Sequence, residues 1–305
     1  MLDRVTLRQL RIFAAAARHL HFGRAAEELN LTQPAVSIQL KELELEVGMP
    51  LFERMGRRTH LTSAGAELWA HVRDLLARLR EADEAMESLK GGSAGQLQIA
   101  ATTTAEYFAP RLLAQFRRVH PGLRIRLTVD NRQAVVRALA DNTIDLAIMG
   151  QAPRELDTVA VAFARHPLAI VAAPDHALAR KRRLKLAQLA NETFLIRERG
   201  SGTRDAMERA FAAQRFRPAE MIETGSNETI KQAVMAGMGV SFLSLHTVGL
   251  EASTRRLVVL PVSSMPVMRD WYAVHRARKH LSPATAAFRE YLVAEGARLI
   301  ARIMA

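Results

Sequence analysis

Small polar side chains gather at the start of one helical pattern, in the stretch LTQPAVSIQL at residues 31–40. Thr32 can accept a backbone hydrogen bond and so begin a helix, or it can bond a phosphate group. Gln33 and Ser37 follow one turn apart and can hydrogen-bond base edges in the major groove of DNA. Pro34 offers a flat apolar contact for a thymine methyl group. The chemistry that these residue types indicate is the reading of duplex DNA.

Three arginines follow in the stretch LFERMGRRTHLT at residues 51–62. Two short strands around MGRR would form a wing, and Arg54, Arg57 and Arg58 would then lie near a phosphate backbone or a minor groove. Lys41, on the preceding helix, completes the predicted DNA-binding set. A helical hairpin alone is a weak signal, but an adjoining arginine-rich wing makes it a specific one.

Three short helical patterns must position these side chains. Thr6 and Gln9 form a capping box that opens a helix through about Ala17, and a second helix fits residues 23–29. The third helix begins at the polar stretch described above. Its apolar residues recur at spacings of four, three and four, which predicts one buried stripe of Val36, Leu40, Leu43 and Val47. We therefore expect an all-α winged helix-turn-helix domain over residues 1–62.

A long helix is predicted next, because residues 66–90 contain neither glycine nor proline. Its apolar residues repeat about every 3.5 positions, at Val72, Leu75, Leu79, Ala82, Met86 and Leu89. Such a repeat predicts a linker helix over residues 63–91 that pairs with the same helix of a second chain. The alternative is a single helix that lies on its own domain. The segment GGSAG at 91–95 would follow as a flexible break.

Strand and helix patterns alternate from residue 96 onward. QLQIAA, RIRLTV and DLAIMG have the composition of strands, and helical stretches lie between them. This alternation predicts parallel sheets with helices on both faces. We expect an α/β domain over residues 92–305, built as two doubly wound lobes like those of periplasmic binding proteins. Lobe I would hold about 96–162 and 267–305, lobe II about 163–266, and strand ends would open onto a cleft between them.

The distribution of charge favours an anionic ligand as well as DNA. The 305-residue chain has a net charge of +12, and residues 96–305 hold the surplus, with 30 Lys and Arg against 18 Asp and Glu. Arg132 and Arg204 supply planar, permanently charged guanidinium groups that suit a carboxylate or phosphate. The stretch ERGSGTR at 198–204 would place free backbone N–H groups at a helix start, where anions bind. A plain strand-to-helix turn fits that stretch equally well.

Enzyme chemistry finds no support in the sequence. G-x-S-x-G and H-E-x-x-H motifs, a phosphate loop and cysteine are missing, and the histidines are scattered. We therefore expect no catalytic residue, no metal and no cofactor. A solute-binding protein is the second rival, because two lobes around a cleft suit that role, but the N-terminal winged unit and the lack of an export signal argue against it. The expected location is the cytoplasm, with no membrane partner.

The stretch FGRAAEELNLTQPAVSIQLKELELEVGMPLFERMGRRTHLTSAG resembles the winged helix-turn-helix of the LysR-type transcriptional regulators. The linker helix and the two lobes are similar to the rest of that family. The resemblance implies base-reading roles for Gln33, Pro34 and Ser37 and a wing role for Arg57. It also implies a tetramer, built as a dimer of dimers, that binds an interrupted inverted repeat upstream of a promoter. Contact with RNA polymerase is left open.

Several C-terminal stretches, among them ERGSGTRDAMERAF and DWYAVHR, resemble the Calvin-cycle regulators called CbbR, a subgroup of that family. The likeness implies control of carbon-fixation or related central-metabolism genes by a small anionic metabolite. Candidates are a phosphorylated sugar, phosphoenolpyruvate and a nicotinamide dinucleotide phosphate. The alternative is a regulator of an unrelated pathway with a different effector. The family's effector site, carried onto this sequence, falls on Thr102, Thr103, Asn131, Arg132, Ser201, Thr203 and Asn227, and Arg204 joins them on chemical grounds.

Overall fold

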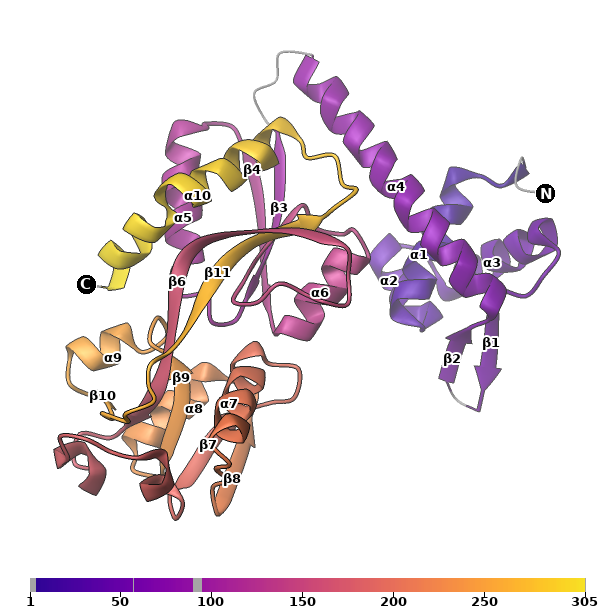
Figure 1. The fold of residues 1–305 in the computed structure, drawn as a ribbon. Coiled ribbons are helices and arrows are strands. Elements are labelled where there is room, and N and C mark those ends of the chain that lie inside the picture. Colours follow the sequence, from indigo (N-terminus) through magenta and orange to yellow (C-terminus); the bar gives the residue numbers. More distant parts are fainter. Residues whose placement is uncertain (1–3, 57, 90–94, 305) are drawn as a thin grey trace. The chain divides into compact units, whose positions relative to one another are not determined.

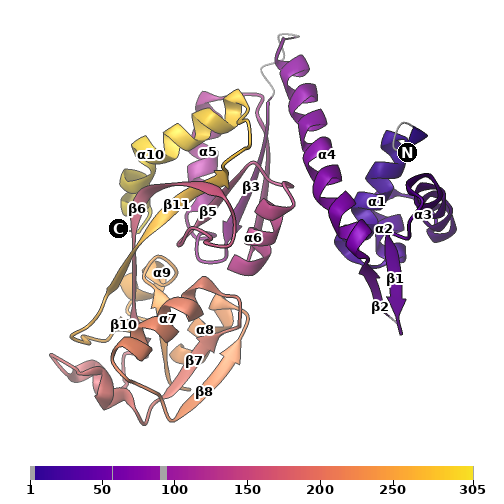
Figure 2. The ribbon, with the colours of Figure 1, turned by 45° about the vertical axis from the view of Figure 1, so that its right-hand side comes forward.

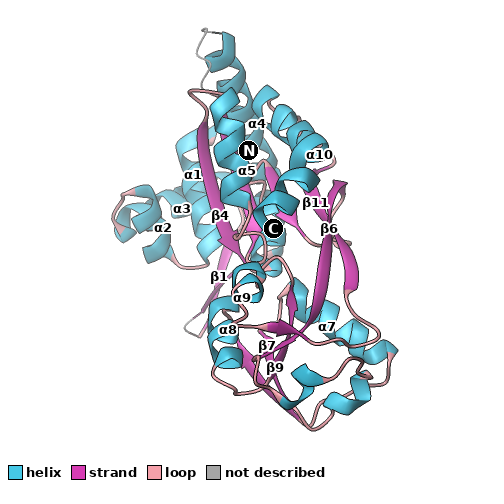
Figure 3. Cartoon of the chain, turned by 90° about the vertical axis from the view of Figure 1, so that its left-hand side faces the viewer, coloured by secondary structure: helices cyan, strands magenta, loops and turns pink. Residues whose placement is uncertain are grey.

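The computed structural model describes residues 4–56, 58–89 and 95–304. The chain divides into two compact units, Met1–Asp83 and Glu84–Ala305. The first unit is mainly helical, and the second contains a large mixed sheet with helices around it (Figures 1 and 3). Within the described ranges, no helix is both long and apolar enough to cross a membrane.

Three helices form the core of the first unit: α1 (Leu7–His19), α2 (Phe22–Leu29) and α3 (Gln33–Val47). The predicted capping box of Thr6 and Gln9 is present at the start of α1. Thr32 caps α3 by accepting a hydrogen bond from the backbone N–H of Ala35, and Gly48 ends the helix in a left-handed conformation. The predicted apolar stripe of α3 is buried and packs against α1 and α2 in one cluster.

The predicted wing is an antiparallel hairpin of β1 (Phe52–Met55) and β2 (Arg58–Leu61). Glu44 of α3 holds its base, because one carboxylate oxygen accepts hydrogen bonds from the backbone N–H groups of Leu51 (2.7 Å) and Phe52 (3.1 Å). A Cβ atom at Gly65, near the start of the next helix, would lie 2.0 Å from the carbonyl oxygen of Leu51, so only glycine fits there. These contacts fix the wing against α3.

Helix α4 (Ser63–Leu89) follows the wing and carries the predicted heptad repeat. Val72 packs into the helical core of the first unit. Leu75, Leu79 and Met86 are instead 44%, 37% and 54% exposed. An apolar stripe on one face of this helix is thus open to solvent. Residues 91–94 of the predicted flexible break lie outside the described residues.

Nine strands in the described part of the second unit form one mixed sheet in the order β4–β3–β5–β11–β6–β9–β7–β8, with β10 paired to β6. The strands are β3 (Gln96–Thr102), β4 (Arg124–Asp130), β5 (Leu146–Met149), β6 (Thr158–Ala172), β7 (Thr193–Arg197), β8 (Glu220–Thr224), β9 (Val240–Ser244), β10 (Val258–Val259) and β11 (Val267–Arg276). The helices are α5 (Ala109–Val119), α6 (Arg132–Ala140), α7 (Gly202–Ala213), α8 (Asn227–Met235), α9 (Gly249–Ser253) and α10 (Pro283–Met304), with short 3₁₀ turns η2 (Ala177–Arg180) and η3 (Leu186–Leu189).

Two separate cores divide this sheet into lobes. In lobe I, β3 runs parallel to β4 and β5, and apolar side chains of α5 and α10 cover one face while those of α6 cover the other. In lobe II, β7 runs parallel to β8 and β9, with α7 on one face and α8 on the other. Parallel strands covered on both faces need helical crossovers, which the alternating sequence pattern supplies.

Two long antiparallel strands, β6 and β11, join the lobes (Figures 1 and 2). In lobe I, β11 also pairs with β5, so the DWYAVHR segment returns to the first sheet as predicted. At its far end β6 pairs with β9 of lobe II. The predicted fold class is confirmed: a winged helix-turn-helix with a long helix, followed by two doubly wound lobes. Both lobes share the two crossing strands, so the residues on these strands can face both lobes.

Candidate functional sites

The start of α3 presents the predicted base-reading side chains on its surface. Gln33, Pro34 and Lys41 are exposed, and Ser37 is half-buried one turn after Gln33. The side-chain amide of Gln33 donates a hydrogen bond to the Ser37 hydroxyl at 3.1 Å. Because the opposite stripe of α3 is buried, the helix can offer this polar face to a groove without losing its packing.

The wing presents positive charge close to its turn. Arg54 on β1 and Arg58 on β2 are exposed, and Gly56 between the strands has a left-handed backbone with φ of 63°. Arg57, the third predicted wing arginine, lies outside the described residues. Glu44, which anchors the wing, was not anticipated from the sequence. A single acidic residue on an amphipathic helix gives no signal that distinguishes such a structural role from solvent exposure.

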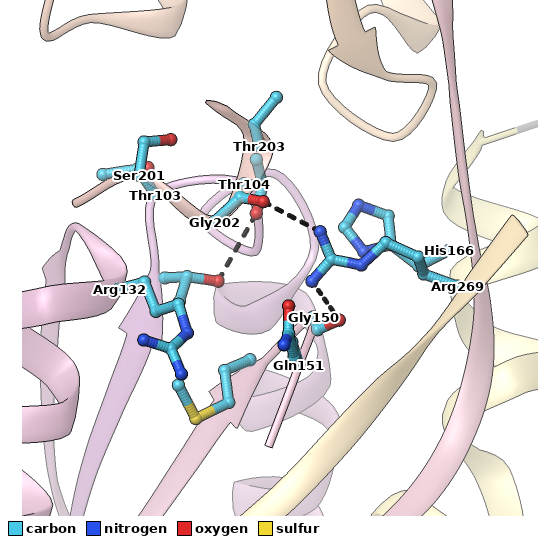
Figure 4. A pocket seen from close by; sticks show the side chains of 12 residues that line it. Thr103, Thr104, Arg132, Gly150, Gln151, His166, Ser201, Gly202, Thr203 and Arg269 are labelled. Atoms are coloured by element: carbon cyan, nitrogen blue, oxygen red, sulfur yellow. Dashed lines mark hydrogen bonds between the residues drawn. The ribbon is translucent and has the colours of Figure 1, made fainter. Parts of the chain in front are cut away.

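A cavity lies between the two lobes where the carboxyl ends of several strands meet (Figure 4). The space not filled by atoms is about 330 Å³, part of it open to solvent. The lining combines hydroxyl groups, backbone and cationic side chains, and it consists of Thr102, Thr103, Thr104, Arg132, Met149, Gly150, Gln151, His166, Ser201, Gly202, Thr203 and Arg269. No acidic residue of the described chain is part of this lining. Such a surface suits a small anion.

The N-terminus of α7 points its first residues at the cavity. Ser201 is the N-cap residue, yet its side chain makes no capping hydrogen bond. The preceding Gly200 has φ of 87°, and its carbonyl oxygen accepts a hydrogen bond from the backbone N–H of Gln133 in lobe I at 3.2 Å. The ERGSGTR stretch therefore places a helix start, with its partial positive charge, beside the cavity.

Arg269 of β11 is the most central cation of this site. Its guanidinium donates hydrogen bonds to the carbonyl oxygens of Gly202 in lobe II, at 2.9 Å, and of Gly150 in lobe I (Figure 4). Burial, together with the charges of Arg209 and Arg132, lowers the pKa of Arg269 to about 10. The group remains protonated at neutral pH. Within the described part of the chain it forms no ion pair, so its charge is available to a ligand.

Arg132 at the start of α6 contributes a second cation. Its guanidinium pairs with Glu155 at 3.0 Å, and this hydrogen bond lowers the pKa of the Glu155 carboxyl. The Nε atom of Arg132 is buried and has no hydrogen-bond partner. An anion that entered the cavity would therefore meet an arginine that is positioned by one carboxylate but still has an unsatisfied donor.

Beside the cavity, a buried arginine connects the lobes. Arg197 at the end of β7 donates to the Thr103 hydroxyl of lobe I at 3.2 Å and to the Asn227 side chain at 2.6 Å, and it pairs with Glu198. Asn227 in turn donates to the Thr103 carbonyl oxygen at 3.3 Å. This network holds the threonine turn of lobe I against lobe II.

The structure brings together five of the eight effector residues predicted from sequence, namely Thr102, Thr103, Arg132, Ser201 and Thr203. The other three lie outside the lining. Asn131 caps α6 by accepting from the Ala134 N–H. Arg204 pairs with Glu208 and Glu223, and Asn227 is buried in the Arg197 network. Each of these three side chains has hydrogen-bond partners within the protein, and a direct contact with the ligand stays a prediction for them.

His166, Arg269, Gln151 and Thr104 line the cavity but were missed from the sequence. His166 on β6 and Arg269 on β11 lie directly opposite each other in the antiparallel pair of these two strands. Only the pairing of segments that are far apart in the chain places them there. Thr104 was the one with a signal, since it continues the run of threonines at the end of β3.

Comparison with known proteins agrees with both parts of this architecture. The model of the bacterial regulatory helix-turn-helix protein, lysR family, matches residues 7–66, and that of the LysR substrate binding domain matches residues 90–297. The chain belongs to the LysR family of transcriptional regulators. Regulators of this family bind DNA and small-molecule effectors and are not enzymes.

Individual proteins that this chain resembles include regulators of known name. The RuBisCO operon transcriptional regulator of Allochromatium vinosum is 50% identical over 299 residues, covering 98% of this chain and 99% of that protein. The regulator CbbR of Rhodospirillum rubrum is 51% identical over 288 residues, covering 94% of this chain and 96% of that protein. The structure of the CcmR regulatory domain of Synechocystis PCC6803 in complex with 2-PG is 39% identical, with a TM-score of 0.63, and covers 65% of this chain and 96% of that one.

Proposed function

We propose that this protein regulates carbon-fixation genes by binding DNA near their promoter, and that a compact anionic metabolite in the interlobe cavity modulates this binding. Support for the regulated genes comes from relatives about half identical over nearly the whole chain, of which one is named a RuBisCO operon transcriptional regulator and another the transcriptional regulator CbbR. The observation that carries the effector is the cavity itself, where two arginines and a helix start meet hydroxyl groups with no acidic side chain in the described lining.

The DNA contacts follow from the surface of the first unit. In this proposal the α3 side chains read bases and the wing arginines contact phosphates, with the roles falling on Thr32, Gln33, Pro34, Ser37, Lys41, Arg54, Arg57 and Arg58. The exposed polar face of α3 and the fixed position of the wing against it support this division. As a DNA-binding regulator the protein would act in the cytoplasm.

The size of the cavity favours a compact effector. Because the 330 Å³ includes open solvent, it is an upper limit on the room for a ligand. A nicotinamide dinucleotide phosphate, which has several times as many atoms as phosphoenolpyruvate, exceeds this limit in the present conformation. Lining hydroxyls and backbone N–H groups would bond the phosphate oxygens, and Arg132 and Arg269 would balance the charge. The related CcmR domain holds 2-PG, which supports a small ligand.

Self-association completes the proposal. The exposed stripe on α4 pairs two chains through their heptads, and an isologous contact of this kind gives a two-fold dimer. Two such dimers would form a tetramer that spans an inverted repeat. An anion that favours one arrangement of the lobes would shift the spacing of the DNA-reading heads, because a ligand moves an equilibrium only by its difference in affinity for the two states.

Isothermal titration of the full chain tests the effector site. The panel contains phosphoenolpyruvate, a sugar phosphate, NADPH and the two phosphorylated acids abbreviated 2-PG, phosphoglycolate and phosphoglycerate. We expect a compact phosphorylated acid to bind, and Arg132→Ala to weaken it by about tenfold or more, because a hydrogen bond between charged groups is lost.

Arg298→Ala is the matched control, since its guanidinium pairs with Glu295 on α10 and is not part of the cavity lining. Its affinity should stay close to that of the parent. Failure of every anion to bind the parent, or an equal loss in both variants, would refute the cavity as the effector site. Footprinting on the promoter of the RuBisCO operon, with and without the anion that binds, tests whether these carbon-fixation genes are the regulated target.

A further inference from the structure

His166 occupies the floor of the interlobe cavity and is 2% exposed. It lies on β6, two residues before the strand begins to pair with β9 of lobe II. Its ring stacks on the indole of Trp271, with centroids 3.9 Å apart and planes inclined by 16°. The stacking fixes the ring, so its edge is held at one place in the cavity wall, close to Arg269 (Figure 4).

Neither ring nitrogen of His166 has a hydrogen-bond partner in the structure. An imidazole always carries at least one N–H donor, and a buried donor without a partner costs free energy. The nearest candidates are engaged elsewhere. The indole N–H of Trp271 donates to Nδ1 of His246 at 2.9 Å, and Arg269 donates to Gly150 and Gly202. A rigid polar group of this kind, unsatisfied at the wall of a cavity, calls for a partner that enters from outside.

The surroundings of His166 favour its neutral form. Burial lowers the pKa of His166 well below its usual value, and the charge of Arg269 and the nearby His246 lower it further. Those two groups face it from β11 and from the segment after β9. Arg132 at the start of α6 is a further charged group of the lining, and the other described wall residues, among them Thr102, Gly150, Gln151 and Ser201, are uncharged.

We propose that His166 binds the effector anion directly, donating a ring N–H to a phosphate or carboxylate oxygen, and that it takes up a proton from solvent when a dianion binds. The inference rests on the proposed effector cavity and names the chemistry of its ligand. No covalent bond changes: solvent supplies the proton, and the neutral imidazole becomes an imidazolium that pairs with the ligand. A permanent dianion is then favoured over a monoanion of the same size. Glu155 already pairs with Arg132, so two negative charges balance Arg269 and the imidazolium, whereas a monoanion leaves one positive charge unbalanced.

The direction of the pH effect follows from the pKa of His166 in the ligand-free protein and in the complex with the dianion. A bound dianion raises the pKa of His166 from the low value that burial gives it. Between these two pKa values, binding takes up a proton and the affinity rises as pH falls. Above the pKa of the complex no proton is taken up and the pH dependence disappears. A residue with only a packing role would produce no such linkage.

Titration calorimetry in two buffers with different ionisation enthalpies measures the number of protons taken up. Two probes are used, phosphoglycolate and inorganic sulfate. Sulfate remains a dianion throughout the neutral range, whereas a phosphate monoester itself titrates near pH 6. The variants are His166→Gln, which lacks a titrating group, and His166→Phe, which keeps a ring on Trp271. His280→Gln, an exposed histidine beyond β11, is the control.

We expect the parent and His280→Gln to take up a fraction of a proton with either probe, and both His166 variants to bind about tenfold more weakly without the His166 contribution. His166→Phe should melt no lower than the parent, since an unsatisfied polar group has been replaced. If the parent binds neither probe but binds another anion of the panel, this inference falls and the effector cavity stands; if no anion of the panel binds, both fall. Binding by the parent with unchanged affinity in both variants overturns the role of His166 alone. Weaker binding by the variants without proton uptake by the parent overturns the protonation step.

Discussion

In the free protein the Gln33 amide donates one N–H to Ser37, and within the described chain its carbonyl oxygen and second N–H are left over. An acceptor beside a donor in one plane matches the edge of an adenine in the major groove. We therefore expect Gln33→Ala to cost about 1–3 kcal/mol on the specific site and little on random duplex. Fluorescence anisotropy with both duplexes measures the difference. Equal losses on the two would remove α3 as the reading helix.

Arg58 provides the matched comparison for that experiment. It is exposed on the wing and its charge would interact with phosphates of any sequence. Arg58→Ala should weaken both duplexes alike and lower the slope of log K against log salt by about one phosphate contact. The two variants together separate base reading from backbone contact in the same unit.

At the scale of single residues, sequence predicts which side chains suit a polar cleft but not the partners that each side chain finds in the fold. Asn131 and Arg204 have side chains suited to a polar cleft, yet Asn131 is used as a helix cap and Arg204 is held by two carboxylates. Their partners are set by folding. His166 shows the reverse case, because its surroundings, with an indole on one face and an arginine nearby, give an ordinary histidine its special position.

Among the elements, those whose pattern is local were predictable. The buried stripe of α3 follows from spacings within 12 residues, and its ends follow from Thr32 and Gly48. The strands β3, β4 and β5 are short runs of apolar and β-branched residues between turn signals. The 15-residue strand β6 runs across the lobe boundary predicted at about residue 162, and its first half is partly exposed whereas its second half is buried. Its register with β11 depends on contacts about 100 positions apart in the chain.

The exposed apolar stripe of helix α4 leads to a prediction about self-association. Leu79 lies in the exposed apolar stripe, where burial against a second copy would remove it from water. Leu79→Asp places a charge at that seam and should shift the protein from an oligomer toward a monomer, with weaker binding to a two-half-site DNA. Multi-angle light scattering at micromolar concentration measures the change. Leu79→Met keeps volume and apolarity and should remain associated. A parent that is already a monomer at this concentration would contradict pairing through α4.

In the molecule as a whole, hydrogen bonds already join the lobes without a ligand. Arg269 bonds Gly150 and Gly202, Gln133 donates to Gly200, and Arg197 reaches Thr103. Outside the cavity lining, the Tyr107 hydroxyl donates to Glu228 of lobe II at 2.6 Å. The same ring lies 4.7 Å from the ammonium group of Lys231, also in lobe II. Burial, followed by the bond to Glu228, raises the pKa of Tyr107, so the phenol stays protonated as the donor.

The Tyr107 hydroxyl allows this junction to be weakened without touching the ligand site. Tyr107→Phe removes one interlobe hydrogen bond but keeps the ring over Lys231, so opening of the lobes should become easier by about 0.5–1.5 kcal/mol. The backbone N–H of Gln133 reports this opening, because its partner is Gly200 across the cleft. Its deuterium exchange, followed by mass spectrometry, should be roughly two- to tenfold faster.

Tyr291→Phe is the control. The Tyr291 hydroxyl reaches Gln115 within lobe I, so this variant should leave the exchange rate of the Gln133 N–H unchanged. Since a bound anion would contact both lobes, it should slow the exchange in the parent and the variant. Equal exchange rates of the Gln133 N–H in the parent and in Tyr107→Phe would show that the lobes do not separate at the Tyr107–Glu228 contact.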